Sequence, residues 1–333
     1  MSTDTFALQR VLVPLDGSPL AQEALSVAEA LARGAGAELH LVSVQAPMIS
    51  AGAEFGLTDR EPPMYGNRDD MEAYLQLVAG LVAHAHAGHP VTAVLVGDPA
   101  ERLADYVEAN AIGLVVMTTH GRGGFSRFWL GSVADRLLRR VNAPILLLRH
   151  ETRMDDAGFE GVVIALDGSP ASERALAPAI ALGSLVPSPQ YTLVRVVVPP
   201  LPSTVTPVGL YPPDAAVQSV QELSAAASEY LEAVADRMRA QGCSVVTRVL
   251  LGSGIAEQIV GFAERSRSQL VAMGTRGATG FDRLMLGSVA DKVVRAAVQP
   301  VLVAPGQSRR RINERPVPAT ARPSHTDNEV LTP

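Results

Sequence analysis

The motif Leu-Gly-Ser-Val-Ala-Asp occurs twice in this chain, at residues 130–135 and again at 286–291. Each copy lies downstream of a related opening segment, VPLDGSP at 13–19 and IALDGSP at 164–170. Two landmarks that recur in the same order indicate an internal duplication. We therefore expect a fold made of two similar halves.

The length of the chain fits this expectation, because 333 residues suit two domains of about 150 residues each. We predict a first domain over residues 1–150, a linker over 151–160 and a second domain over 161–305. Residues 306–333 are polar, basic and rich in proline. Such a composition buries too little apolar surface to fold, so we predict a disordered tail.

The composition is that of a globular protein, with 47% hydrophobic and 19% charged residues. Apolar runs such as 145–148 are far shorter than the roughly 20 residues of a membrane span. The first residues show no basic segment followed by an apolar one, which argues against a signal peptide. These features predict a soluble, cytoplasmic protein without a membrane partner.

The charge and the cysteine content exclude further classes. A net charge of −6 argues against a broad nucleic-acid-binding surface, which is normally basic. The single cysteine, Cys243, rules out an intramolecular disulfide and a cysteine-cluster metal site. We interpret it as an inert thiol.

Short apolar runs alternate with segments of helical periodicity in both halves. Ser18 and Pro19 suit the N-cap and first turn of a helix whose apolar positions recur from Ala21 to Ala32. Strands are predicted at 10–15, 39–44, 91–96, 114–117 and 145–148, and at 161–166, 191–197, 245–250, 270–273 and 301–303. Continuous apolar strands between helices are typical of a parallel sheet covered on both faces. The sequence thus predicts an α/β fold of two tandem doubly wound, Rossmann-like domains with mostly parallel five-stranded sheets.

The predicted elements leave two long irregular stretches, at 46–67 and 199–216, which are candidate lids because long loops in compact domains are often functional. The fifth strands, 145–148 and 301–303, are expected at sheet edges, and exposed apolar edges favour pairing. We expect the two halves to pair within one chain about a pseudo-twofold axis. Dimerisation of the whole chain is a further option.

The repeated motif contains a glycine and a serine at the start of a predicted helix, Gly131-Ser132 and Gly287-Ser288. Free amide groups and the helix dipole at such a position favour an anion, and the serine adds a hydroxyl donor. Asp16 and Asp167 follow the first strand of each half, and ligands bind open α/β sheets beyond the carboxyl ends of the strands. The alternative to a ligand site is a purely structural role, because ordinary turns and helix caps use the same residues.

Other sites are not supported by the sequence. Neither the Gly-x4-Gly-Lys-Ser/Thr phosphate loop nor the Gly-x-Gly-x-x-Gly dinucleotide motif is present. His84, His86 and His89 do not share one helix face, so we interpret them as a solvated helix end rather than a metal site. No set of a nucleophile and a base recurs in both halves, so no catalytic residues are predicted.

These motifs resemble those of the universal stress protein family, specifically its tandem-domain members, over about residues 8–305. Nucleotide-binding members carry the pattern Gly-x2-Gly-x9-Gly-Ser/Thr after the fourth strand. The second half has the whole pattern, at Gly274, Gly277, Gly287 and Ser288. The first half matches at Gly121, Gly131 and Ser132, and Thr118 stands in place of the first glycine.

The resemblance implies the strand order 3-2-1-4-5 and a cleft between strands one and four that binds ATP, with Mg or Mn at the phosphates. It places the adenine ring against Val44 and Val196. The residues that it assigns to the nucleotide are Pro14, Leu15, Asp16, Val44, Met117, Thr118, Gly121, Gly131, Ser132 and Val133, and in the second half Ala165, Leu166, Asp167, Val196, Met273, Gly274, Gly277, Gly287, Ser288 and Val289.

Three functions remain open at this point. The first is a stress-response or regulatory protein that acts through adenine nucleotide occupancy and has at most weak hydrolytic activity. The second is a slow ATP hydrolase or nucleotide transferase. The third is an interaction module that binds no nucleotide.

Overall fold

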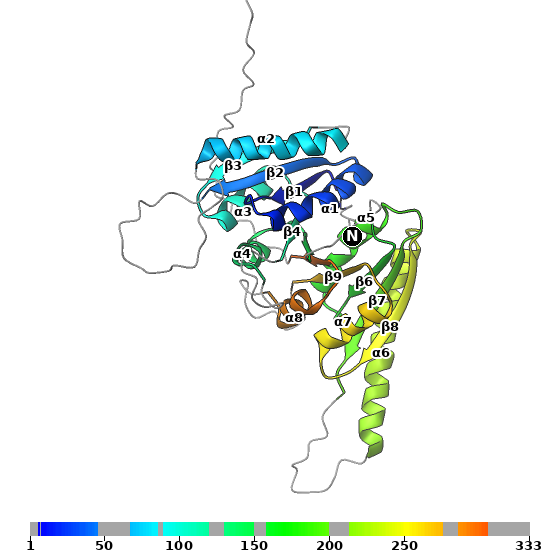
Figure 1. Cartoon of the computed structure of the whole chain (residues 1–333). Coiled ribbons are helices and arrows are strands. Elements are labelled where there is room, and N and C mark those ends of the chain that lie inside the picture. The colour runs from blue at the N-terminus through cyan, green and yellow to red at the C-terminus, as the bar shows by residue number, and fades with distance from the viewer. Residues whose placement is uncertain are drawn as a thin grey trace, which may run out of the picture.

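The computed structural model describes residues 6, 8–45, 67–85, 89–119, 130–149, 158–199, 213–275 and 286–305. Strands and helices alternate through both halves, as predicted (Figure 1). The strands are β1 Arg10–Pro14, β2 Glu38–Gln45, β3 Val91–Val96, β4 Leu114–Thr118, β5 Ile145–Leu148, β6 Gly161–Ala165, β7 Gln190–Val197, β8 Ser244–Leu251, β9 Leu270–Gly274 and β10 Val301–Ala304. The helices are α1 Pro19–Ala35, α2 Arg68–Ala85, α3 Pro99–Ala109, α4 Ser132–Arg140, η1 Ser172–Ala175 (a 3-10 helix), α5 Leu176–Gly183, α6 Pro213–Arg239, α7 Ile255–Arg265 and α8 Ser288–Ala296.

The strands form one sheet with the order β3-β2-β1-β4-β5-β10-β9-β6-β7-β8. The order 3-2-1-4-5 is therefore confirmed in the first half, and the second half repeats it in mirror sequence. Each half contributes five strands, as predicted, and the expected pairing of the fifth strands joins the two sets into a single ten-stranded sheet. The join is antiparallel, with β5 against β10, whereas the pairs within each half are parallel. All residues of these two short strands are buried, so pairing hides edges that would otherwise be exposed.

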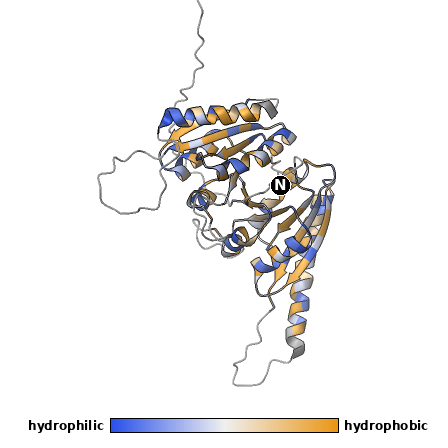
Figure 2. Cartoon of the chain, in the orientation of Figure 1, coloured by the Kyte–Doolittle hydropathy of each residue, from blue (hydrophilic) through white to orange (hydrophobic). Residues whose placement is uncertain are grey.

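Two apolar clusters follow the two faces of the sheet from one half into the other. Successive strand residues point to opposite faces, so Leu12 belongs to one cluster and its neighbours Val11 and Val13 to the other. One cluster lies beneath α1, α2, α5 and α6, and the other beneath α3, α4, α7 and α8. Figure 2 shows mainly hydrophobic strands and helices of mixed character, as expected for a sheet covered on both faces.

The start of α1 follows the sequence prediction. The Ser18 hydroxyl accepts the amide of Ala21 at 3.2 Å, and Pro19 occupies the first turn. In the second half, the matching segment forms a turn, the 3-10 helix η1 and then α5. The same Asp-Gly-Ser-Pro sequence therefore leads into two different helical geometries.

Several predicted features fall wholly or partly outside the described residues. Nearly all of the stretch 46–67 and all of the tail 306–333 lie outside them. The second irregular stretch was predicted to end at about residue 216, and α6 begins slightly earlier, at Pro213. Phe159, at the end of the expected linker, is 2% exposed and belongs to the core. Within the described ranges, the structure contains no helix with the length and apolar character needed to span a bilayer.

Candidate ligand-binding clefts

A cavity lies at the carboxyl ends of the central strands in each half of the sheet. The cavity of the first half measures about 540 Å³ and that of the second about 350 Å³. Each lies where strands one and four of its half diverge towards their helices, the position at which open α/β sheets bind ligands. The duplicated sequence has therefore produced two equivalent clefts.

Every described residue that the sequence assigned to a nucleotide lines one of these cavities. The first is lined by Pro14, Leu15, Asp16, Val44, Met117, Thr118, Gly131, Ser132 and Val133. The second is lined by Ala165, Leu166, Asp167, Val196, Met273, Gly274, Gly287, Ser288 and Val289. The two remaining predicted residues, Gly121 and Gly277, lie outside the described residues. The assigned residues thus come together in space, although they come from strands and helices far apart in sequence.

Other lining residues were missed by the sequence interpretation. They include Val42 and Leu103 in the first cleft, and Val194, Ile255 and Arg195 in the second. Pairing partners would have revealed two of them, because Pro14 pairs with Val42 and Ala165 with Val194. The apolar side chains give each cleft a hydrophobic wall suited to a flat ring.

The aspartates have a structural task in both halves. The amide of Ser18 donates to Asp16 Oδ1 at 2.9 Å, and the amide of Ser169 donates to Asp167 Oδ1 at 2.8 Å. Each carboxylate therefore closes the turn that follows the first strand, as the structural alternative predicted. Because the turn uses one oxygen of each carboxylate, it also holds the group at the wall of the cleft.

The helices α4 and α8 begin without a side-chain cap. Their N-cap residues are Gly131 and Gly287, and neither helix start has a hydrogen bond from a capping side chain. By contrast, α1 and α3 are capped by Ser18 and Asp98. The amide groups in the first turn of α4 and α8 are thus left available at the cleft, together with the positive end of the helix dipole. Such a helix start favours an anionic group.

Gly274 is explained by packing as well as by the nucleotide motif. A Cβ atom at this position would lie 2.6 Å from the backbone oxygen of Ala171 and 3.0 Å from Cα of Ser172. The backbone leading into η1 therefore needs a glycine on β9. In the first half, where α1 starts directly after its turn, Thr118 occupies the corresponding place and lines the cavity. The difference between the halves follows from the different helix starts.

The described residues contain no cluster of three or more potential metal-ligating side chains. Of the three histidines interpreted as a solvated helix end, His89 is exposed, and the side chains of His84 and His86 lie outside the description. Burial raises the pKa of the Cys243 thiol, which agrees with the interpretation of an unreactive cysteine.

The chain is similar to known proteins over most of its length. Universal stress protein Rv2005c of Mycobacterium tuberculosis is 32% identical over 202 residues, which cover 59% of this chain and 63% of that protein. The match therefore spans less than two thirds of that relative. Universal stress protein Rv1996 of the same organism is 27% identical over 319 residues, covering 88% of this chain and 94% of the relative.

A crystal structure of a universal stress protein from Archaeoglobus fulgidus has the same fold, with a TM-score of 0.61 at 20% identity, covering 90% of this chain and 97% of that one. The model of the universal stress protein family matches residues 7–149 and again 158–305. The chain therefore belongs to the universal stress protein family, with two copies of the family's domain in tandem.

Proposed function

We propose that each half of the chain binds ATP in its cleft, with a divalent metal at the phosphates, and that occupancy of the clefts regulates a stress response. The phosphates would lie at the starts of α4 and α8. The ribose hydroxyls would face Asp16 or Asp167, and the adenine ring would lie against Val44 or Val196. The proposal retains residues 1–150 and 161–305 as the two nucleotide-binding units.

One observation carries this proposal: an uncapped helix start and a fixed carboxylate line the same cavity, and the arrangement occurs twice. An anion is favoured at the helix start, and the carboxylate can accept hydrogen bonds from neutral hydroxyls. A ligand with an anionic end, a hydroxylated middle and an apolar ring matches this order of groups. ATP has all three.

The described lining residues favour binding over rapid turnover. The carboxylates among them are Asp16 and Asp167, and both accept hydrogen bonds that close their own turns. Ser132 and Ser288 are exposed at the helix starts, where they are suited to donate to a phosphate. We therefore propose that the nucleotide acts as a bound effector.

The proposal can be tested by titrating ATP and magnesium into nucleotide-free protein by calorimetry. Ser132→Glu and Ser288→Glu each place a carboxylate in the first turn of α4 or α8. A negative charge there stabilises the helix and repels a phosphate. Each variant should therefore fold but lose ATP binding in its own cleft, the first for Ser132→Glu and the second for Ser288→Glu. Ser26→Glu, at an exposed position on α1, is the matched control.

We expect two ATP molecules per chain in the parent and in the control, and one in each of the other variants. Denaturing freshly purified protein and identifying released small molecules would show whether a nucleotide is already carried. Absence of ATP binding to the nucleotide-free parent would overturn the proposal and leave an interaction module.

A further inference from the structure

Among the described lining residues, the second cleft contains a cation, Arg195, that has no counterpart in the first cleft. Because Pro14 pairs with Val42 and Ala165 with Val194, the next residues along β2 and β7, Ser43 and Arg195, occupy equivalent positions. Ser43 is 1% exposed, and its hydroxyl has no hydrogen-bond partner. Arg195 is partly exposed and lines the second cavity. The duplicated clefts therefore differ in charge at one defined place.

The guanidinium group of Arg195 lies beside the turn that carries Asp167. A Cβ atom built on Gly168 would be 3.3 Å from Cζ and from both terminal nitrogens of Arg195. Gly168 has φ +92°, a conformation that favours glycine, so the guanidinium packs closely against bare backbone. On another side, Cζ lies 5.2 Å from the centre of the Tyr230 ring, a cation–π distance. These two contacts fix where the charge is held.

Among the residues that the structure describes, none forms a hydrogen bond or an ion pair with the guanidinium group of Arg195. The carboxylate of Glu173, which accepts the hydroxyl of Tyr230 at 3.0 Å, is paired with Arg237 at 2.7 Å instead. With respect to the described residues, a planar fork of donors therefore stays available beside Gly168, the residue that follows Asp167.

We propose that Arg195 binds a phosphate on the ribose of the nucleotide in the second cleft, so that this cleft prefers adenine nucleotides with a second phosphate on the sugar. The inference rests on the proposed function, in which Asp167 faces the ribose hydroxyls. A guanidinium beside the turn that carries this carboxylate would lie on the ribose side of the cleft and can hold a phosphate in a bidentate manner. Dinucleotide-binding folds use an arginine near the ribose in the same way for a 2′-phosphate. The first cleft, with Ser43, has no such preference.

The test compares AMP with adenosine 3′,5′-bisphosphate and adenosine 2′,5′-bisphosphate, which differ from AMP only by the ribose phosphate. The Ser132→Glu variant blocks the first cleft and leaves the second, and Ser288→Glu does the reverse. We expect the second cleft to bind at least one bisphosphate about tenfold more tightly than AMP, as one charge-assisted contact predicts. The first cleft should bind all three with similar affinity.

Substitutions of Arg195 then identify the group responsible. In the Ser132→Glu background, Arg195→Ser and Arg195→Met should both abolish the preference, while Arg195→Met retains packing on Tyr230. Arg248→Ser is the control, because this exposed β8 guanidinium donates to the carbonyl of Thr247. Thermal unfolding of each variant without ligand separates a loss of the contact from a loss of folding.

The outcomes distinguish the inference from the proposed function. ATP binding to the second cleft with equal affinities for AMP and both bisphosphates would overturn the inference and leave the proposed function standing. A preference that survives in folded Arg195→Met would also overturn it. Failure of the Ser132→Glu variant to bind any of the nucleotides would overturn both for this cleft.

Discussion

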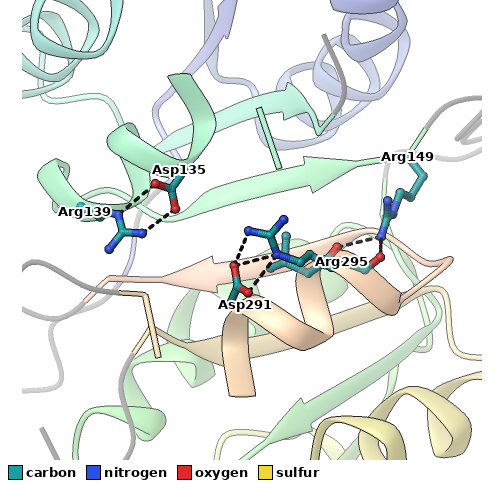
Figure 3. A network of polar contacts seen from close by, with 6 residues as sticks. Asp135, Arg139, Arg149, Asp291 and Arg295 are labelled. Carbon is teal, nitrogen blue, oxygen red and sulfur yellow. Dashed lines mark hydrogen bonds and ion pairs between the residues drawn. The ribbon is translucent and has the colours of Figure 1, made fainter. Parts of the chain in front are cut away.

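Arg149, the residue after β5, donates from Nε to the backbone oxygen of Ala297 at 2.9 Å. It also donates to the carbonyl oxygens of Val294, at 2.8 Å, and of Arg295 (Figure 3). A residue of the first half thereby supplies the hydrogen bonds that the C-terminal end of α8 lacks within its own helix. Pro305, which follows β10 as Arg149 follows β5, occupies the equivalent position in the second half, and its side chain has no hydrogen-bond donor. The join between the halves is therefore asymmetric at this point.

We predict that Arg149→Met lowers the free energy of unfolding by about 2 kcal/mol, because it removes charged hydrogen bonds to a partly buried helix end. Burial lowers the pKa of Arg149 from its ordinary value, but the group remains charged at neutral pH. Urea denaturation followed by circular dichroism would measure the change. Arg33→Met, at an exposed position on α1, should change stability little. Equal changes in the free energy of unfolding for the two substitutions would show that the hydrogen bonds of Arg149 do not stabilise the protein.

Because the backbone of Ala171 lies so close to Gly274, we expect a side chain to be tolerated at position 118 but not at the equivalent position 274. Gly274→Thr, which copies the first half, should destabilise the protein by about 3 kcal/mol because the new side chain meets backbone rather than a movable side chain. The reverse change, Thr118→Gly, should cost about 1 kcal/mol, the ordinary penalty for glycine in a strand. Chemical denaturation of both variants checks this. If Gly274→Thr were as stable as Thr118→Gly, the close approach seen here would not constrain the sequence.

His40 on β2 predicts a pH dependence of stability. The ring is 3% exposed, with Nδ1 at 2.9 Å from the Tyr106 hydroxyl and Nε2 at 3.1 Å from Glu38 Oε2. Burial lowers its pKa, against the opposing effect of Glu38. The unfolded chain therefore binds this proton more readily than the folded chain. The resulting contribution to stability is fully present above the ordinary pKa of 6.5 and is lost as the pH falls below it.

We expect the parent to lose more unfolding free energy than His40→Gln between about pH 7.5 and about pH 5.5, on either side of that ordinary pKa. Urea denaturation at both pH values gives the comparison. His89→Gln, which removes an exposed histidine, should behave like the parent. A pH dependence that is unchanged in His40→Gln would assign the effect to other groups.

The sequence allowed the elements to be predicted well because each half alternates apolar strands with amphipathic helices. The strands at 91–96 and 145–148 have the predicted bounds, and Ser18 caps α1 as expected. The continuity of the sheet was harder to predict. A local pattern identifies an apolar edge strand, but it does not show that two such strands pair to make one continuous sheet. That property depends on contacts between β5 and β10, which are distant in sequence.

The candidate clefts show the same division between local and distant information. Asp167 and Ser288 belong to short motifs, so they could be assigned from the sequence. Arg195 belongs to no motif, and its place beside Gly168 results from the register of β6 with β7. The requirement for Gly274 likewise comes from a segment packed against it. Residues whose role depends on a distant neighbour could not be recognised from local patterns.

The turns closed by Asp16 and Asp167 allow charge to be tested separately from structure. Asn has a side-chain oxygen that can accept the same turn hydrogen bond, so Asp16→Asn and Asp167→Asn should retain the turn and change stability little. If each carboxylate accepts hydrogen bonds from ribose hydroxyls, either change should weaken ATP binding at its own cleft about tenfold, because a charged acceptor becomes neutral. Asp16→Ala and Asp167→Ala remove both the turn hydrogen bond and the charge, so they should lower stability as well as ATP affinity. The ATP affinity of each Asn variant is measured by calorimetric titration. The other cleft is blocked by Ser288→Glu for Asp16→Asn and by Ser132→Glu for Asp167→Asn. Unchanged ATP affinity in both would limit these aspartates to closing the turn.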